Sequence, residues 1–126
     1  MTPMKLIEAI AHIEGFYAPL GADGEPNRPQ RNNNPGNLDF ESWMVEKYEA
    51  KLEECTPHPR FAHFPSISIG FQALHDLLAG PDYCNLTVAQ AIDRYAPPTE
   101  NDTIHYINYV CRILGCLSTD LVSKVL

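Results

Sequence analysis

The sequence predicts a mostly helical α+β fold in which a small β-hairpin lies beside a helical lobe. Three observations lead to this prediction. Apolar residues recur at helical spacing in several segments that begin at capping residues and end at glycine or proline. Two short segments, near Leu38 and at 60–64, alternate apolar and polar residues as strands do. With 126 residues and no repeats or linkers, residues 1–126 are expected to form a single domain.

The first expected helix has an N-cap and an N-terminal proline at Thr2-Pro3 and ends at about Glu14, directly before a glycine. Glu14 falls on the same helical stripe as Ile7 and Ile10, which is expected to face the core. A carboxyl group on such a stripe is costly unless it is paired or protonated. Glu14 is therefore either a structural ion-pair partner, for example of Arg31, or a proton donor.

The middle of the chain predicts the hairpin. Residues 17–30 are rich in proline and glycine and are expected to form an irregular loop. Glu41–Glu54 has apolar residues at helical spacing and predicts a helix of three to four turns, and the prolines that follow break it. The segment 60–64 is expected to pair with the strand near Leu38.

Capping signals place the later helices. Ser66 is expected to cap a core helix that ends at Gly80-Pro81, and Thr87 with Gln90 predicts a capping box. Two further helices are expected, one capped at 101–103 with a glycine stop and one running from Ser118 through Val125.

The stretch Arg31–Leu38, which reads Arg-Asn-Asn-Asn-Pro-Gly-Asn-Leu, is unusual. Pro35 removes a donor and pushes Asn34 into an extended conformation, while glycine and asparagine tolerate positive φ. The stretch therefore predicts a tightly specified turn lined with amide groups. Such groups suit the hydroxyl and N-acetyl groups of sugars, because amides both donate and accept without charge. The alternative is a surface loop in which asparagine only forms the turn.

Composition limits the partners and cofactors. The net charge of −7 and the lack of a Lys/Arg cluster argue against nucleic acid. No apolar run approaches the ~18 residues that span a membrane, so no membrane span is expected. With no secretory signal, we expect synthesis in the cytoplasm and reduced cysteines. Cys55, His58 and His63 lack a fourth ligand, so neither a metal nor a cofactor is expected.

Four blocks of sequence occur in a suggestive order: Glu14-Gly15-Phe16-Tyr17, then Arg31–Leu38, then 60–65 with 70–74, then 95–103. Together they resemble a bacteriophage and prophage branch of the lysozyme-like superfamily, whose members cut the glycan strands of peptidoglycan. The resemblance covers nearly the whole chain. Its specific parts are the asparagine turn and the Tyr-Ala-Pro-Pro…Glu-Asn block.

The resemblance implies a lysozyme-like fold: a helix that ends in the catalytic acid, a hairpin that roofs the cleft, and a helical lobe behind. By this resemblance Glu14 is the general acid that protonates the glycosidic oxygen. One cleft wall is then formed by the turn residues Asn34, Gly36 and Asn37. The opposite wall, which orients substrate or water, is formed by Tyr95, Glu100 and Asn101.

Glycosidases commonly use a second carboxylate, for which Asp39, Glu41 and Glu100 are candidates. The availability of Asp39 and Glu100 favours hydrolysis of the β-1,4 bond between N-acetylmuramic acid and N-acetylglucosamine. The alternative is a lytic transglycosylase, in which the substrate's acetamido group assists and a 1,6-anhydro ring forms. That route needs no second carboxylate.

The acidic charge departs from lysozymes that adsorb to anionic walls. It fits a protein brought to the cell wall or periplasm by a phage particle or another delivery system, or one that is part of a virion. It also fits a non-catalytic structural or glycan-binding protein on the same fold.

Overall fold

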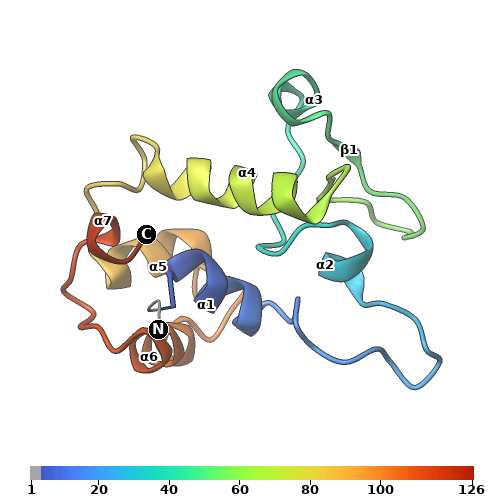
Figure 1. Cartoon of the computed structure of the whole chain (residues 1–126). Helices are drawn as coiled ribbons and strands as arrows, with labels where there is room; N and C mark the ends of the chain where they lie inside the picture. The colour runs from blue at the N-terminus through green and yellow to red at the C-terminus, as the bar shows by residue number, and fades with distance from the viewer. Residues whose placement is uncertain (1–3) are drawn as a thin grey trace. The chain divides into compact units, whose positions relative to one another are not determined.

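The structure is a computed structural model that describes residues 4–126, so the predicted N-cap at Thr2-Pro3 lies outside the described residues. It is mostly helical with one two-stranded antiparallel sheet, which confirms the α+β prediction (Figure 1). The chain forms two compact units. The terminal unit comprises the residues up to Ile13 together with His75–Leu126, and the central unit comprises Glu14–Leu74. That residues 1–126 act as one domain stays a prediction.

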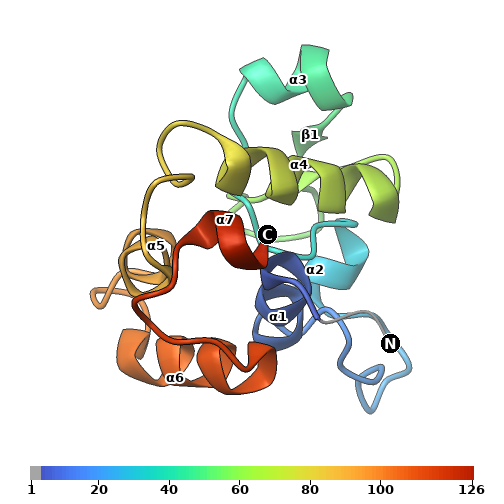
Figure 2. The same ribbon diagram turned by 60° about the vertical axis from the view of Figure 1, so that its left-hand side comes forward.

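The terminal unit is built from four helices and the end of a fifth: α1 (Leu6–Ile13), α5 (Val88–Tyr95), α6 (Thr103–Leu114), α7 (Val122–Val125) and the last residues of α4 (Ile67–Ala79). Helix α6 packs against both α1 and α5, and lies beside them in both ribbon views (Figures 1 and 2). The fully buried apolar side chains of the terminal unit include Leu6, Ile10, Leu78, Val88, Ile92, Val110 and Val122.

The predicted capping signals of this unit are confirmed. Thr87 accepts from the backbone N–H of Gln90, whose side chain accepts from the Thr87 backbone in return, and α5 begins there. The Asp102 carboxylate accepts from a backbone N–H in the first turn of α6. Gly115, with φ of +66°, ends α6.

The last helix is shorter than predicted. Helix α7 begins at Val122 instead of Ser118. Residues 117–120 form a turn instead, in which the Asp120 carboxylate accepts from the backbone N–H of Leu117 at 2.9 Å. Leu121 then has an extended backbone, bridges to Thr87 and serves as the N-cap, so α7 begins only at the next residue.

The central unit contains α2 (Arg28–Arg31), α3 (Trp43–Tyr48), strands β1 (Lys51–Leu52) and β2 (Ala62–His63), and the first two turns of α4. The strands pair antiparallel, with Lys51 opposite His63 and Leu52 opposite Ala62.

The predicted helix over Glu41–Glu54 is wrong in its second half. Glu49 has a left-handed backbone with φ of 54°, which ends α3. The residues that follow extend into β1, and the Glu53 backbone N–H donates to the Phe61 carbonyl. Pairing with β2, whose residues lie 10 to 12 positions further along the chain, thus overrides a local helical pattern.

The predicted pairing of segment 60–64 with the strand near Leu38 is confirmed. Asp39 and Phe61 form an antiparallel bridge, and the Ala62 backbone N–H donates to the Leu38 carbonyl at 2.9 Å. The loop prediction for residues 17–30 is wrong at its end, because Asn27 and a glutamine form a capping box that starts α2.

Helix α4 meets the asparagine turn at a glycine. A Cβ atom on Gly70 would lie 1.9 Å from the Asn33 carbonyl oxygen and 2.9 Å from Cδ of Pro35. Neither atom can swing away, because one belongs to the backbone and the other to a buried proline ring. Only glycine allows this approach.

We expect Gly70→Ala to destabilise the protein. Overpacking against backbone costs about 3 kcal/mol at the upper end of its usual range. Alanine's better helix propensity returns about 1 kcal/mol, so the net loss is about 2 kcal/mol. Urea unfolding followed by circular dichroism measures it. The control is Gly21→Ala, whose new methyl group meets a flexible aspartate side chain first. Equal stability of the two variants would contradict the close approach.

Candidate active site

Glu14 follows the last residue of α1, as predicted to within one residue. The buried residues of α1 are Leu6, Ala9, Ile10 and Ala11. On the stripe that Glu14 shares, Ile10 is fully buried and Ile7 is half-buried. Glu14 itself is half-buried, which corrects the expectation of a fully core-facing carboxyl group. The next residue, Gly15, has φ of +88° and turns the chain away.

The asparagine turn supplies a partner for Glu14. Asn37 Nδ2 donates a hydrogen bond to Glu14 Oε1 at 3.1 Å. Asn37 has φ of 51°, a left-handed conformation that asparagine tolerates and that most residues avoid. Its backbone N–H donates to the Asn34 carbonyl and so closes the turn. The structure therefore brings together Glu14 and one residue of the predicted cleft wall.

Asn34 is the anchor of the turn. Its side chain is fully buried, and its Nδ2 donates to the carbonyl oxygens of Leu38 and Ala62 at 3.0 and 2.9 Å. Its Oδ1 accepts from the Leu38 backbone N–H at 2.9 Å. With these bonds made, the amide of Asn34 has no donor left for a ligand. Asn34 would shape a cleft by holding the turn. Gly36, also buried, lies in the same turn.

The neighbouring amides are also used inside the protein. Asn33 Nδ2 donates to the Phe64 carbonyl at 3.0 Å, and Asn32 Nδ2 donates to the Glu53 carboxylate at 3.1 Å. Both amide donors of Asn34, and one each of Asn32 and Asn33, are therefore used inside the protein. That the turn also offers amides to sugar groups stays a prediction. The internal hydrogen bonds fix the backbone that carries Asn37.

The side-chain oxygen of Asn37 is in an unusual environment. Its Oδ1 is buried and has no hydrogen-bond partner among residues 4–126. A buried acceptor without a donor costs about 1–3 kcal/mol, so such atoms are rare. Rotating the amide by half a turn would point Oδ1 instead of Nδ2 at Glu14. Asn37 can thus donate to an ionised carboxylate or accept from a protonated one.

The other predicted site residues are distributed as follows. Asp39 is exposed, and its Oδ1 pairs with Arg60 Nε at 2.6 Å. Tyr95 is half-buried at the end of α5, and Glu100 and Asn101 are exposed in the following loop. These three belong to the terminal unit, whereas Glu14 belongs to the central unit. That they face Glu14 stays a prediction.

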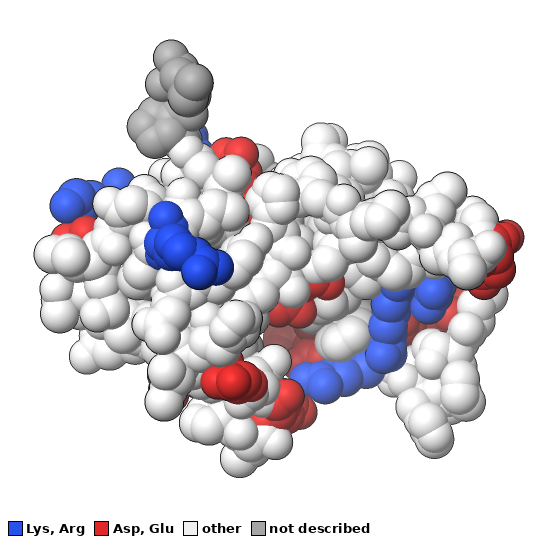
Figure 3. Space-filling view, turned by 90° about the horizontal axis from the view of Figure 1, so that it is seen from below, with Lys and Arg blue, Asp and Glu red and all other residues white. Residues whose placement is uncertain are grey.

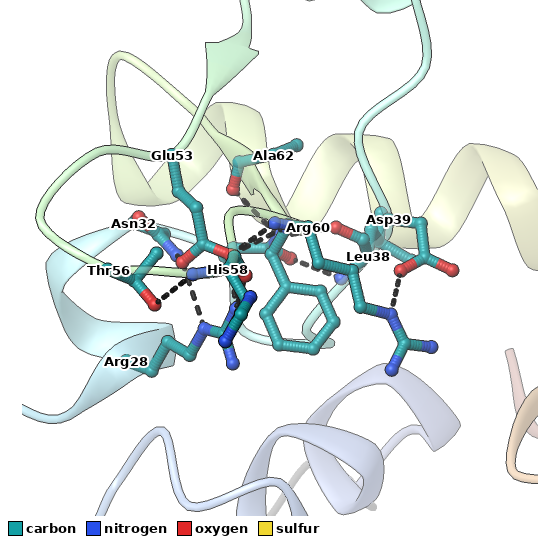
Figure 4. Close-up of polar contacts among 11 residues, drawn as sticks. Arg28, Asn32, Leu38, Asp39, Glu53, Thr56, His58, Arg60 and Ala62 are labelled. Atoms are coloured by element: carbon teal, nitrogen blue, oxygen red, sulfur yellow. Dashed lines mark hydrogen bonds and ion pairs between the residues drawn. The ribbon is translucent and has the colours of Figure 1, made fainter.

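A second carboxylate, Glu53, organises the base of the hairpin (Figure 4). Its side chain is fully buried, and Arg28 binds it through two nitrogens, with Nε 2.9 Å from Oε1. The backbone N–H groups of Arg60 and Phe61 donate to Oε2 at 2.9 and 2.7 Å, and Asn32 donates to Oε1. The Phe61 ring lies against the guanidinium groups of both arginines. Each oxygen of the buried charge is therefore satisfied.

This environment sets the acidity of Glu53. The Arg28 hydrogen bonds lower the pKa of Glu53 far below its ordinary value and outweigh burial, which raises it; the backbone and Asn32 donors lower it further. No local pattern separates Glu53 from the glutamates beside it, which is why the sequence did not single it out. Its partners are Arg28 and Asn32, which lie more than 20 residues earlier in the sequence, and the backbone directly before β2.

Glu53→Gln is expected to destabilise the protein by about 3 kcal/mol at pH 7, because an amide cannot accept from all these donors or neutralise Arg28. A lowered pKa means that the wild type gains stability above the ordinary value of 4.5 and loses it as the pH falls below that value. The gap between wild type and variant should narrow by about 2 kcal/mol between pH 7 and pH 3.

Urea unfolding at a series of pH values measures this gap. Glu54→Gln is the matched control, because the Glu54 side chain is exposed and makes only a long, solvent-exposed ion pair of 3.9 Å with Lys51. A gap that stays constant with pH would contradict the assigned role of the Glu53 charge.

The surface charges, the possible metal ligands and the lengths of the helices bear on the expectations from the sequence. On the face drawn in Figure 3, Lys and Arg side chains form separate groups with Asp and Glu among them. Within residues 4–126, no three side chains of the metal-binding types His, Cys, Asp and Glu gather to hold a metal ion. No helix in the described part of the chain is long and apolar enough to cross a membrane.

In comparisons with known proteins, no family model matches the chain and no curated protein matches it.

Proposed function

We propose that this protein is a peptidoglycan glycosidase that cleaves the β-1,4 bond between N-acetylmuramic acid and N-acetylglucosamine, with Glu14 as general acid. The observation that carries the proposal is the half-buried Glu14 carboxyl group held by Asn37 on a rigid asparagine turn. Glu14 donates its proton to the glycosidic oxygen as the bond from that oxygen to the anomeric carbon breaks.

Asn37 supports this role because it suits both protonation states of an acid catalyst. Its Nδ2 donates to Glu14 Oε1, and its unpartnered Oδ1 is able to accept from the protonated carboxyl group after the amide rotates. A general acid passes through both states in every turnover. A partner that bonds to each of them keeps the carboxyl group oriented throughout.

The product depends on which group attacks the anomeric carbon after Glu14 has donated its proton. In hydrolysis, a water molecule adds to the anomeric carbon while a base takes its proton. In the transglycosylase route, the substrate's own 6-hydroxyl attacks the anomeric carbon and gives its proton to the Glu14 carboxylate, and a 1,6-anhydro sugar forms. The ion pair of Asp39 with Arg60 supports the second route to the extent that it engages one of the three candidate second carboxylates. We therefore keep lytic transglycosylation as the second candidate.

Glu14→Gln is expected to lower the rate of glycan cleavage on the order of 10³-fold, because glutamine keeps the shape and has no acidic proton. The assay is digestion of purified peptidoglycan, with the products identified by mass spectrometry. Glu46→Gln, on the exposed side of α3, is the matched control and should digest peptidoglycan at the wild-type rate.

The products decide between the candidates. Reducing-end muropeptides would establish hydrolysis, and 1,6-anhydro products would establish transglycosylation. Cleavage at equal rates by wild type and Glu14→Gln would rule out Glu14 as the acid. If the folded wild type releases no products, the glycosidase proposal fails and a glycan-binding or virion role replaces it.

Asn37→Gly tests the positioning of the acid. Glycine keeps the left-handed backbone and removes the amide, so we expect the turnover rate to fall roughly tenfold to a hundredfold with the fold retained. Asn33→Gly is the matched control, because Asn33 has φ of 50° and its amide bonds to Phe64 instead of Glu14. It should lose about 1 kcal/mol of stability and keep more of its turnover rate than Asn37→Gly does, because its amide bonds to Phe64 and not to Glu14. Equal activity losses in both variants would assign Asn37 a purely structural role.

A further inference from the structure

Two cysteines lie at the C-terminal end of α6, one in its last turn and one two residues after the helix ends. Gly115, in the left-handed conformation, donates its backbone N–H to the Cys111 carbonyl, and Cys116 does the same at 3.1 Å. This pattern is a Schellman-type helix end, in which the residue two places after the helix packs against the residue in its last turn. Here those two residues are Cys116 and Cys111.

The backbone hydrogen bond from Cys116 to Cys111 brings the two residues together, and both are half-buried, so they remain open to a small reagent. A helix end of this type places the side chains of these two positions side by side. Two cysteines held in this way can form a disulfide with little movement of the backbone.

We propose that Cys111 and Cys116 are a redox modification site that closes to an intramolecular disulfide in an oxidising compartment and reopens in a reducing one. The proposal does not depend on the glycosidase activity, because neither cysteine is among the residues assigned to that activity.

The oxidant is a disulfide such as oxidised glutathione. One cysteine thiolate attacks a sulfur of glutathione disulfide, which forms a mixed disulfide and releases one glutathione thiolate. The second cysteine, as thiolate, attacks the protein sulfur of the mixed disulfide and releases the second glutathione. Two protons leave the thiols, and two electrons pass from the cysteine pair to the glutathione disulfide.

The surroundings of Cys116 set the pH dependence of the reaction. Burial, then the neighbouring Cys111, and to a smaller extent Asp120 raise the pKa of the Cys116 thiol to about 11. Cys116 is therefore mostly protonated at pH 8, and its thiolate, which is the reactive form, is scarce there. The reaction should accelerate as the pH rises above 8.

The disulfide would stabilise a segment that already holds α5. Directly after Cys116, the carbonyl groups of Ser118 and Asp120 accept from the backbone N–H groups of Ala89 and Val88 at 3.0 and 2.8 Å. Closing the disulfide fixes this segment to the end of α6. A covalent loop of this size should raise the melting temperature by roughly 5 °C.

Trypsin offers a direct test, because Arg112 lies between the two cysteines. The protein is equilibrated with oxidised glutathione at pH 8, alkylated, and digested. Cleavage after Arg94, Arg112 and Lys124 puts Cys111 on peptide 95–112 and Cys116 on peptide 113–124. We expect a mass equal to both peptides joined, less two hydrogen atoms, and its loss after treatment with dithiothreitol.

Three variants make the result specific. Cys111→Ser and Cys116→Ser should each abolish the joined peptide and the rise in melting temperature on oxidation, whereas Cys84→Ser should keep both. Separate alkylated or glutathione-bearing peptides from the oxidised wild type would overturn the proposal. So would a link from either cysteine to Cys84 or Cys55.

Discussion

The buried amide of Asn34 is the interaction on which the central unit depends. A buried amide must find partners for its donors and its acceptor, and Asn34 finds them at Leu38 and Ala62. These bonds connect the turn to the backbone of Leu38 and to β2. A hydrophobic side chain of similar size would therefore leave several backbone groups without hydrogen-bond partners. The close approach of α4 at Gly70 is possible only because the turn is held in this one conformation.

Glu53 extends the same logic from amides to a charge. A carboxylate taken out of water needs a counter-charge and donors for both oxygens, and here it receives them from Arg28, Asn32 and the backbone directly before β2. The hairpin has only two paired residues in each strand, too few to be stable alone. Glu53 therefore contributes the cross-link that the short ladder lacks, while Asn32 joins this cluster to the asparagine turn.

Helix ends were predictable from the sequence because capping is local. Thr87 with Gln90, Asp102 and Gly115 each act within four residues of their own position. The end of α3 was not predictable, because the apolar spacing continues past Tyr48 and only pairing with β2, further along the chain, decides that the chain extends. In the site, the sequence indicated Glu14 and the turn. It could not show that Asn32, Asn33 and Asn34 donate hydrogen bonds inside the protein. Three of the four acceptors lie 21 to 31 residues away in the sequence, so no local pattern reveals them.

A turn whose amides are already bonded has little conformational entropy left to lose. Ordering a flexible loop around a ligand costs free energy that is subtracted from affinity. The backbone from Asn32 to Asn37 is ordered by its own hydrogen bonds before any ligand arrives. A molecule that docks beside this turn therefore meets a preorganised surface, and its affinity would reflect the contacts it makes, with little deduction for ordering the protein.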